Sequence, residues 1–128
     1  MKILLDTSVL IDVLRGRNNR RNLLANLLRD GHSLTTSVLN VAEVYAGMRP
    51  GEEAQTAEFL NGLDCLELNE SGACMAGHLK NSWAQKGRTL TLADTIVAAI
   101  AIEHCCTLFT DNRKDFPMPE IQLYQAIE

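Results

Sequence analysis

Residues 2–16 have the sequence KILLDTSVLIDVLRG, and the hydrophobic period of this segment changes at Asp6. Residues 3–5 are uninterrupted apolar side chains, the pattern of a short strand that is buried on both faces. From Thr7 to about Gly16, the apolar side chains return at helical spacing and mark one face of a helix. The segment therefore predicts a strand that leads directly into a helix, with a carboxylate at the junction.

Short apolar segments and amphipathic segments continue to alternate along the rest of the chain. We predict further strands at residues 33–36, 64–68, 107–110 and 121–123, the last at a sheet edge. We predict further helices at residues 20–31, from a cap at Thr36 or Ser37 to about 48, and at 52–61, 69–86 and 92–105. Strands that alternate with helices, without hairpin turns, are typical of βαβ units. The sequence therefore predicts the α/β class, with three layers (α/β/α) around a mainly parallel central sheet.

Length and composition favour a single domain over residues 1–128. A chain of 128 residues, 46% of them apolar, can bury roughly two-thirds of the surface of its extended form. Asp6 and Asp12 interrupt the apolar residues at the start, so we expect neither a secretion signal nor a membrane span. We therefore expect a cytoplasmic protein that is not associated with a membrane.

The four cysteines, Cys65, Cys74, Cys105 and Cys106, do not have the spacing of a zinc site. No Cys-x-x-Cys pair occurs, and Cys74 with His78 is the one pair whose spacing could clamp a metal on a helix. Because no second pair completes such a site, we expect reduced and buried thiols.

The net charge of −4 is unusual for a protein that binds nucleic acid, because phosphates are normally bound by Lys and Arg. Divalent cations bound to acidic residues would cancel part of this charge. The basic residues are grouped at or near predicted loops: Arg15, Arg17, Arg20 and Arg21; Lys86 and Arg88; Arg113 and Lys114. Net charge therefore neither excludes RNA as a ligand nor favours it.

Four acidic residues lie where carboxylates suggest a functional site. Asp6 and Asp111 end or follow predicted strands, and ligands of α/β sheets bind at the carboxyl ends of the strands. Glu43 interrupts an otherwise apolar helix, and Asp94 opens the most apolar helix of the chain. A buried lone carboxylate is costly unless it is paired or bound to a metal. Carboxylates without interleaved basic residues indicate a hard cation, Mg²⁺ or Mn²⁺.

Each of these acids also has a purely structural interpretation. Asp6 could cap the helix that follows it, and Asp94 completes the capping-box pattern Thr91-x-x-Asp94. Asp111 could form an Asx turn, and Glu43 could pair with an arginine or face solvent. The hypothesis of a metal site therefore depends on the four acids together and on none of them alone.

Four motifs, in order, resemble the PIN domain family and, within it, the VapC-type toxins of bacterial toxin–antitoxin pairs. They are ILLDTSVLI at residues 3–11, SVLNVAE at 37–43, LADTIVAA at 92–99 and TDNRKDF at 110–116. The resemblance covers the whole chain and implies the α/β/α fold of PIN domains. It matches Asp6, Glu43 and Asp94 to the three metal-site acids of the family.

The resemblance implies further roles and partners. Asp111 matches the fourth and more variable acid, Asp115 could share that position, and Thr110 matches a hydroxyl that supports the acidic site. The implied activity is that of a Mg²⁺- or Mn²⁺-dependent endoribonuclease, which hydrolyses RNA phosphodiester bonds to leave 5′-phosphate and 3′-hydroxyl ends. The implied assembly is a homodimer in a tight complex with a cognate VapB-like antitoxin. Candidate RNA-binding residues are Lys86, Arg88, Arg113 and Lys114.

Other functions stay open as alternatives. A housekeeping RNA-processing nuclease of the same family would share the site, and a catalytically silent regulatory module would be expected to lack one of the acids. A phospho-accepting signalling domain needs paired acids after its first strand, whereas Asp6 is followed by Thr7. A phosphatase of the haloacid dehalogenase kind needs an aspartate where this chain has Ser8.

Overall fold

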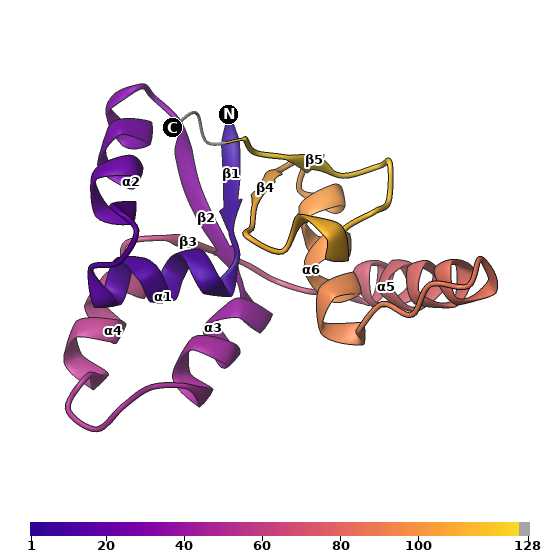
Figure 1. Ribbon diagram of the computed structural model, residues 1–128, viewed down its shortest axis with the longest axis horizontal. Coiled ribbons are helices and arrows are strands. Elements are labelled where there is room, and N and C mark those ends of the chain that lie inside the picture. Colours follow the sequence, from indigo (N-terminus) through magenta and orange to yellow (C-terminus); the bar gives the residue numbers. More distant parts are fainter. Residues whose placement is uncertain (126–128) are drawn as a thin grey trace.

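The short apolar segment after Met1 forms the central strand of a parallel sheet. The computed structural model describes residues 1–125, and in it β1 (Lys2–Leu5) pairs with β2 (Ser33–Ser37) and β4 (Thr107–Phe109). Two shorter strands complete the sheet, β3 (Asp64–Leu66) beside β2 and β5 (Gln122–Leu123) beside β4. The order is β3-β2-β1-β4-β5, and all four pairings are parallel (Figure 1). The predicted α/β class and the edge position of the last strand are confirmed.

Helices cover both faces of this sheet, as Figure 1 shows. Those on one side are α1 (Thr7–Arg15), α2 (Arg20–Arg29), α3 (Val38–Ala46) and α4 (Glu53–Asn61). Those on the other side are α5 (Glu70–Gln85) and α6 (Leu92–Glu103). The sheet and its two helical coverings are the three predicted layers.

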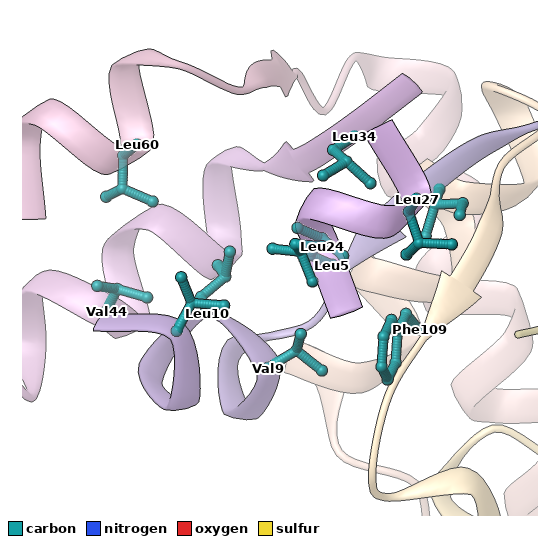
Figure 2. Packing of buried hydrophobic residues seen from close by; sticks show 11 residues of the cluster. Leu5, Val9, Leu10, Leu24, Leu27, Leu34, Val44, Leu60 and Phe109 are labelled. Carbon is teal, nitrogen blue, oxygen red and sulfur yellow. The ribbon is translucent and has the colours of Figure 1, made fainter. Parts of the chain in front are cut away.

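The alternation of side chains along β1 divides the hydrophobic core in two. Ile3 and Leu5 pack with the side chains of α1 to α4, whereas Leu4 packs with α6 on the opposite face. Figure 2 shows the first cluster, in which Leu5, Leu34 and Phe109 from the strands meet leucines and valines of the helices. A Leu or Val that is fully buried stabilises the fold by roughly 1.5–3 kcal/mol. This double-sided burial explains why β1 needs an uninterrupted apolar sequence.

Several predicted boundaries differ from the structure by one or two residues. The second predicted helix, α2, ends at Arg29, α3 ends at Ala46 instead of about residue 48, and β3 ends at Leu66 instead of residue 68. The last helix, α6, ends at Glu103 because Cys105 has a left-handed backbone conformation (φ 55°), which cannot continue an α-helix. These differences leave the predicted order of elements unchanged.

The prediction for the cysteines is only partly correct. All four are free thiols, but Cys65, Cys74 and Cys105 are exposed, and Cys106 alone is buried. Cys65 lies on the edge strand β3, and Cys74 lies on an exposed position of α5. In residues 1–125, no helix is both long enough and apolar enough to cross a membrane.

Candidate active site

The strand order creates a topological switch point between β1 and β4. The chain moves from β1 outward to β2 and β3, and later returns to β4 on the other side of β1. Ligands of open α/β sheets bind at such a point, outside the carboxyl ends of the strands. Asp6 follows β1 there, and its backbone N–H donates to the carbonyl of Phe109, the last residue of β4, at 2.9 Å. The structure therefore brings the first and last motifs together at the expected edge.

Three hydrogen bonds hold the carboxylate of Asp6, which is 8% exposed. Its Oδ1 accepts from the backbone N–H of Thr7 and from Nδ2 of Asn40, each at 2.9 Å. Its Oδ2 accepts from the hydroxyl of Thr110 at 2.7 Å. The structural interpretation of Asp6 as a helix cap is thus correct, but the cap uses only one of its bonds. The other bonds come from distant elements and offset the cost of burying the carboxylate.

Asn40 is a site residue that the sequence analysis did not identify. Its side chain is fully buried on α3, and Nδ2 also donates to the hydroxyl oxygen of Thr7 at 2.9 Å. Its Oδ1 accepts from the hydroxyl of Ser37 at 2.5 Å, so the amide is bonded on both sides. A signal was present, because Asn40 lies one helical turn before Glu43 in an otherwise apolar segment.

Glu43 lies on α3 and is exposed, as in the alternative in which it faces solvent. Of its neighbours in sequence, Val44 is buried, whereas Ala42 and Tyr45 are exposed, so Glu43 lies on the solvent side of the helix. Its Oε1 accepts from the hydroxyl of Thr7 at 2.7 Å. Among residues 1–125 it forms no ion pair with an arginine or a lysine. Thr7 therefore connects Glu43 to the network of Asn40 and Asp6.

Asp94 lies in the first turn of α6, where its backbone N–H donates to the hydroxyl oxygen of Thr91 at 3.1 Å. The capping interaction is therefore present. Burial raises the pKa of the Asp94 carboxyl, and the negative charges of Asp115, Asp6 and Glu43 raise it further, whereas a hydrogen bond with Thr91 lowers it. The carboxylates of Asp6, Glu43, Asp94 and Asp115 thus share one electronegative environment.

Asp111 is held differently from the other acids. Its Oδ1 accepts from the Arg20 guanidinium at 2.5 Å, and the same guanidinium lies 3.4 Å from Asp12 and over the ring of Phe109. Asp111 is not among the charges that raise the pKa of Asp94, whereas Asp115 is. Asp115 belongs to the single-turn helix η1 (Arg113–Asp115). The structure therefore brings Asp115 into the acidic cluster and pairs Asp111 with an arginine.

The donor groups fit a hard divalent cation, because the described groups that act on Asp94 are carboxylates and include no thiol or imidazole. Within residues 1–125, no three Asp, Glu, His or Cys side chains are close enough to hold one ion by themselves. Magnesium does not require such a cage, since it is commonly bound by one or two carboxylates together with waters and substrate phosphates. A complete protein cage of the kind that zinc needs is absent from the described residues.

The four candidate RNA-binding residues are all exposed, and the structure brings their two loops together. The guanidinium of Arg88 donates to the backbone carbonyl of Lys114, so these segments lie side by side. Arg113 donates from Nη1 to the carbonyl of Tyr124 at 3.0 Å, and the ammonium of Lys86 lies 4.4 Å from the centre of the Trp83 ring. Arg88 thus lies beside the segment that contains Arg113, Lys114 and Asp115.

Comparison with known proteins matches the sequence and the fold of this chain to one family. Residues 3–118 match the family model for the PIN domain. A protein of Mycobacterium tuberculosis named Ribonuclease VapC19 is 32% identical over 120 residues, which are 93% of this chain and 96% of that protein. The structure of VapBC2 from Rickettsia felis, bound to a promoter DNA fragment, matches with a TM-score of 0.86 at 23% identity, over 97% of this chain and 98% of that one. A toxin–antitoxin complex from Klebsiella pneumoniae matches with a TM-score of 0.77 at 26% identity, over 93% and 94% of the two chains.

Proposed function

This chain belongs to the PIN domain family, and on that premise we propose that it is a metal-dependent endoribonuclease, the toxin of a toxin–antitoxin pair. The observation that supports this most strongly is the fixed carboxylate of Asp6 at the β1/β4 switch point, with acidic groups close enough to raise the pKa of Asp94. The ribonuclease relative matches over almost the whole chain. Family membership also disfavours the phospho-accepting and phosphatase alternatives, whose motifs are lacking.

Asp6 and Asp94 are the residues that we propose hold the cation. Asp6 cannot rotate freely, because both of its carboxylate oxygens accept hydrogen bonds. Burial raises the pKa of Asp94 and repulsion by its acidic neighbours raises it further, and a bound cation would relieve this repulsion. Held here, Mg²⁺ or Mn²⁺ supplies a water of lowered pKa and neutralises charge on the leaving oxygen.

The chain's own groups position the reactants. Asn40 and Thr110 keep the Asp6 carboxylate in one orientation, which is the usual task of residues that bond to a metal ligand. The exposed carboxylate of Glu43, oriented by the Thr7 hydroxyl, is placed to accept a proton from the attacking water. Hydrolysis in line with the leaving 3′ oxygen then gives 5′-phosphate and 3′-hydroxyl ends.

We propose Asp115, and not Asp111, as the fourth acid of this site. Of the three negative charges that raise the pKa of Asp94, that of Asp115 has the largest effect, so Asp115 is a close acidic neighbour. Asp111 is already compensated by the ion pair with Arg20. The positive charge of Arg20 partly cancels the attraction of the Asp111 carboxylate for a metal cation.

The two proposed partners are the RNA strand and the antitoxin. We propose that both bind to charged side chains at the carboxyl edge of the sheet. Arg88, Arg113 and Lys114 flank the acidic cluster and offer contacts to phosphates. An antitoxin that offers Arg or Lys to the cluster gains charge-assisted hydrogen bonds there. The solved relative from Klebsiella pneumoniae is a toxin–antitoxin complex, which supports a partner of this kind. We further propose a homodimer, which light scattering of the purified chain tests.

The function is tested by incubating purified, antitoxin-free protein with total RNA and sequencing the new ends. We expect cleavage with Mg²⁺ or Mn²⁺, none in EDTA, and 5′-phosphates at the cut sites. Undiminished cleavage in excess EDTA contradicts the proposal. Expression in cells separates a toxin from a housekeeping nuclease: the wild type should arrest growth and Asp6→Asn should not. Equal growth at equal protein levels contradicts the toxin assignment.

A further inference from the structure

A hollow lies beside the acidic site, with Thr110 in its wall. Its volume is about 360 Å³, and its walls are Arg20, Phe109, Thr110, Asp111, Arg113, Tyr124 and Gln125. Ligand sites in proteins have volumes from roughly 300 Å³ upward, so one flat ring system fits within it. Thr110 lines this pocket and also donates to Asp6. A ligand in the pocket is therefore adjacent to the carboxylates that we propose to act on the scissile phosphate.

The aromatic wall of the pocket is fixed in place by the sheet. The backbone N–H of Tyr124 donates to the carbonyl of Leu108 at 2.8 Å, and its carbonyl accepts from Arg113. The Tyr124 ring packs against that of Phe109 with centroids 4.9 Å apart. Phe109 is 3% exposed, whereas Tyr124 is only partly buried, so Tyr124 is the ring that a ligand can reach. Such a preordered ring is a stacking platform for a planar ligand.

The polar wall offers an acceptor next to donors. Asp111 uses Oδ1 for Arg20, and its Oδ2 has no hydrogen-bond partner within residues 1–125. Arg113 uses Nη1 for the carbonyl of Tyr124, which leaves its other N–H groups for a ligand. The pocket thus combines an aromatic face, a carboxylate oxygen and a guanidinium.

We propose that this pocket binds one nucleobase of the RNA substrate, adjacent to the scissile phosphate, and that it prefers guanine. Bases of single-stranded RNA are recognised by stacking on aromatic side chains and by hydrogen bonds to their edges. Guanine presents two neighbouring N–H donors, at N1 and N2: Oδ2 of Asp111 accepts one, and the second lone pair of Oδ1 accepts the other beside Arg20. The O6 atom of guanine accepts from Arg113. Adenine and cytosine present one amino group, and uracil presents one N–H between two carbonyls. The proposal rests on the ribonuclease function proposed above.

Binding of single nucleotides tests the pocket without catalysis. Protein in EDTA is titrated with GMP, AMP, CMP and UMP, and the dissociation constants are measured by NMR. GMP should bind most tightly to the wild type. Tyr124→Leu should weaken the binding of all four nucleotides by at least about 5-fold through loss of stacking. Tyr124→Phe, which keeps the ring, should bind them as the wild type does. Asp111→Asn should remove the preference for GMP. Tyr45→Leu changes the chain's other tyrosine, exposed on α3 and outside the pocket, and should have no effect.

Cleavage of an RNA library with randomised bases separates this proposal from the proposed function. The wild type should cut beside guanine at one fixed position, and Tyr124→Leu should lose this bias with a larger rise in KM than fall in kcat. Intact, cation-dependent cleavage with no change of bias in Tyr124→Leu overturns the pocket alone. Absence of cleavage by the wild type overturns the ribonuclease function. If Tyr124→Leu cleaves RNA with the bias of the wild type but is no longer inhibited by the antitoxin, the pocket binds the protein partner and the proposal is wrong.

Discussion

The hydroxyl of Thr110 donates to Oδ2 of Asp6 at 2.7 Å, although 104 residues of sequence separate them. This bond joins the ends of β4 and β1 at the switch point of the sheet. Asn40 holds the other carboxylate oxygen from α3. Three separate elements therefore fix one buried carboxylate before any cation or substrate arrives, and such preorganisation is what a metal-dependent active site requires.

Replacing Asn40 by Ala tests the buried network. Asp6, Thr7 and Ser37 each lose a hydrogen-bond partner, and an unsatisfied buried group costs about 1–3 kcal/mol. We expect a decrease of that size in the free energy of unfolding, measured with urea. We also expect kcat to fall by about 10- to 100-fold, as for other residues that orient a metal ligand. Asn26→Ala, at an exposed position of α2, is the control. Unchanged stability and unchanged kcat in Asn40→Ala contradict the network.

Glu43→Gln tests whether the acids of this edge repel one another. The substitution removes one negative charge near Asp94 and preserves an oxygen that can accept from Thr7. In EDTA at pH 7, the variant should therefore melt at a higher temperature than the wild type. Saturating Mg²⁺ stabilises whichever protein binds it, by about 2.7 kcal/mol at 100 times the dissociation constant.

This stabilisation by Mg²⁺ should be smaller for Glu43→Gln than for the wild type. Glu58→Gln, an exposed change within α4, should alter neither the melting temperature in EDTA nor the stabilisation by Mg²⁺. A melting temperature of Glu43→Gln below that of the wild type in EDTA indicates a stabilising role for the Glu43 charge. That result removes Glu43 from the repelling cluster.

The raised pKa of Asp94 predicts a specific dependence of stability on pH. The folded protein binds the proton of Asp94 more tightly than the unfolded chain, whose carboxyl has a pKa of about 3.9. The contribution of Asp94 to stability is therefore fully present below that pH and is lost as the pH rises through the folded-state value. In EDTA, the stability of the wild type relative to Asp94→Asn should decrease as the pH rises from about 4 to 7. Chemical denaturation at several pH values measures this, and an increase with pH contradicts the assignment.

Two conservative variants distinguish the proposed role of Asp115 in the acidic site from that of Asp111 in the neighbouring pocket. Asp115→Asn should lower the single-turnover cleavage rate at saturating RNA, because Asp115 acts on the acidic cluster. Asp111→Asn should chiefly raise KM, because Asp111 pairs with Arg20 and lines the neighbouring pocket. If Asp111→Asn lowers the single-turnover rate and Asp115→Asn does not, the two assignments must be exchanged.

The parts of the site that lie at strand ends could be predicted from the sequence. Asp6 and Thr110 follow short apolar strands, and the carboxyl ends of parallel strands meet at one edge whatever the details of packing. The helices and their caps were likewise predictable, because Ser37 and Thr91 precede periodic apolar segments. In these cases a local pattern determines the position of the side chain.

The contacts that depend on packing between distant segments could not be predicted. Asn40 reaches Asp6 because of how α3 lies against the start of α1, and no local pattern specifies that orientation. Arg20 and Asp111 are 91 residues apart, and their ion pair decides which acid joins the cluster. The alternatives for Glu43 also stayed open, because apolar neighbours in sequence do not show which side of a helix is covered.

The central claim, that carboxylates at the β1/β4 edge bind a divalent cation with which RNA is cleaved, is tested most directly by one titration. Mn²⁺ is added to the metal-free protein, and calorimetric binding and the rate of RNA cleavage are measured at each concentration. For the wild type and for Asp30→Asn, an exposed change at the end of α2, the rate should rise in proportion to the bound Mn²⁺. Asp6→Asn should bind Mn²⁺ far more weakly and cleave more than about 100-fold more slowly, a larger loss than removal of an outer-shell partner causes. Cleavage by Asp6→Asn at the wild-type rate, or cleavage before any Mn²⁺ is bound, contradicts the claim.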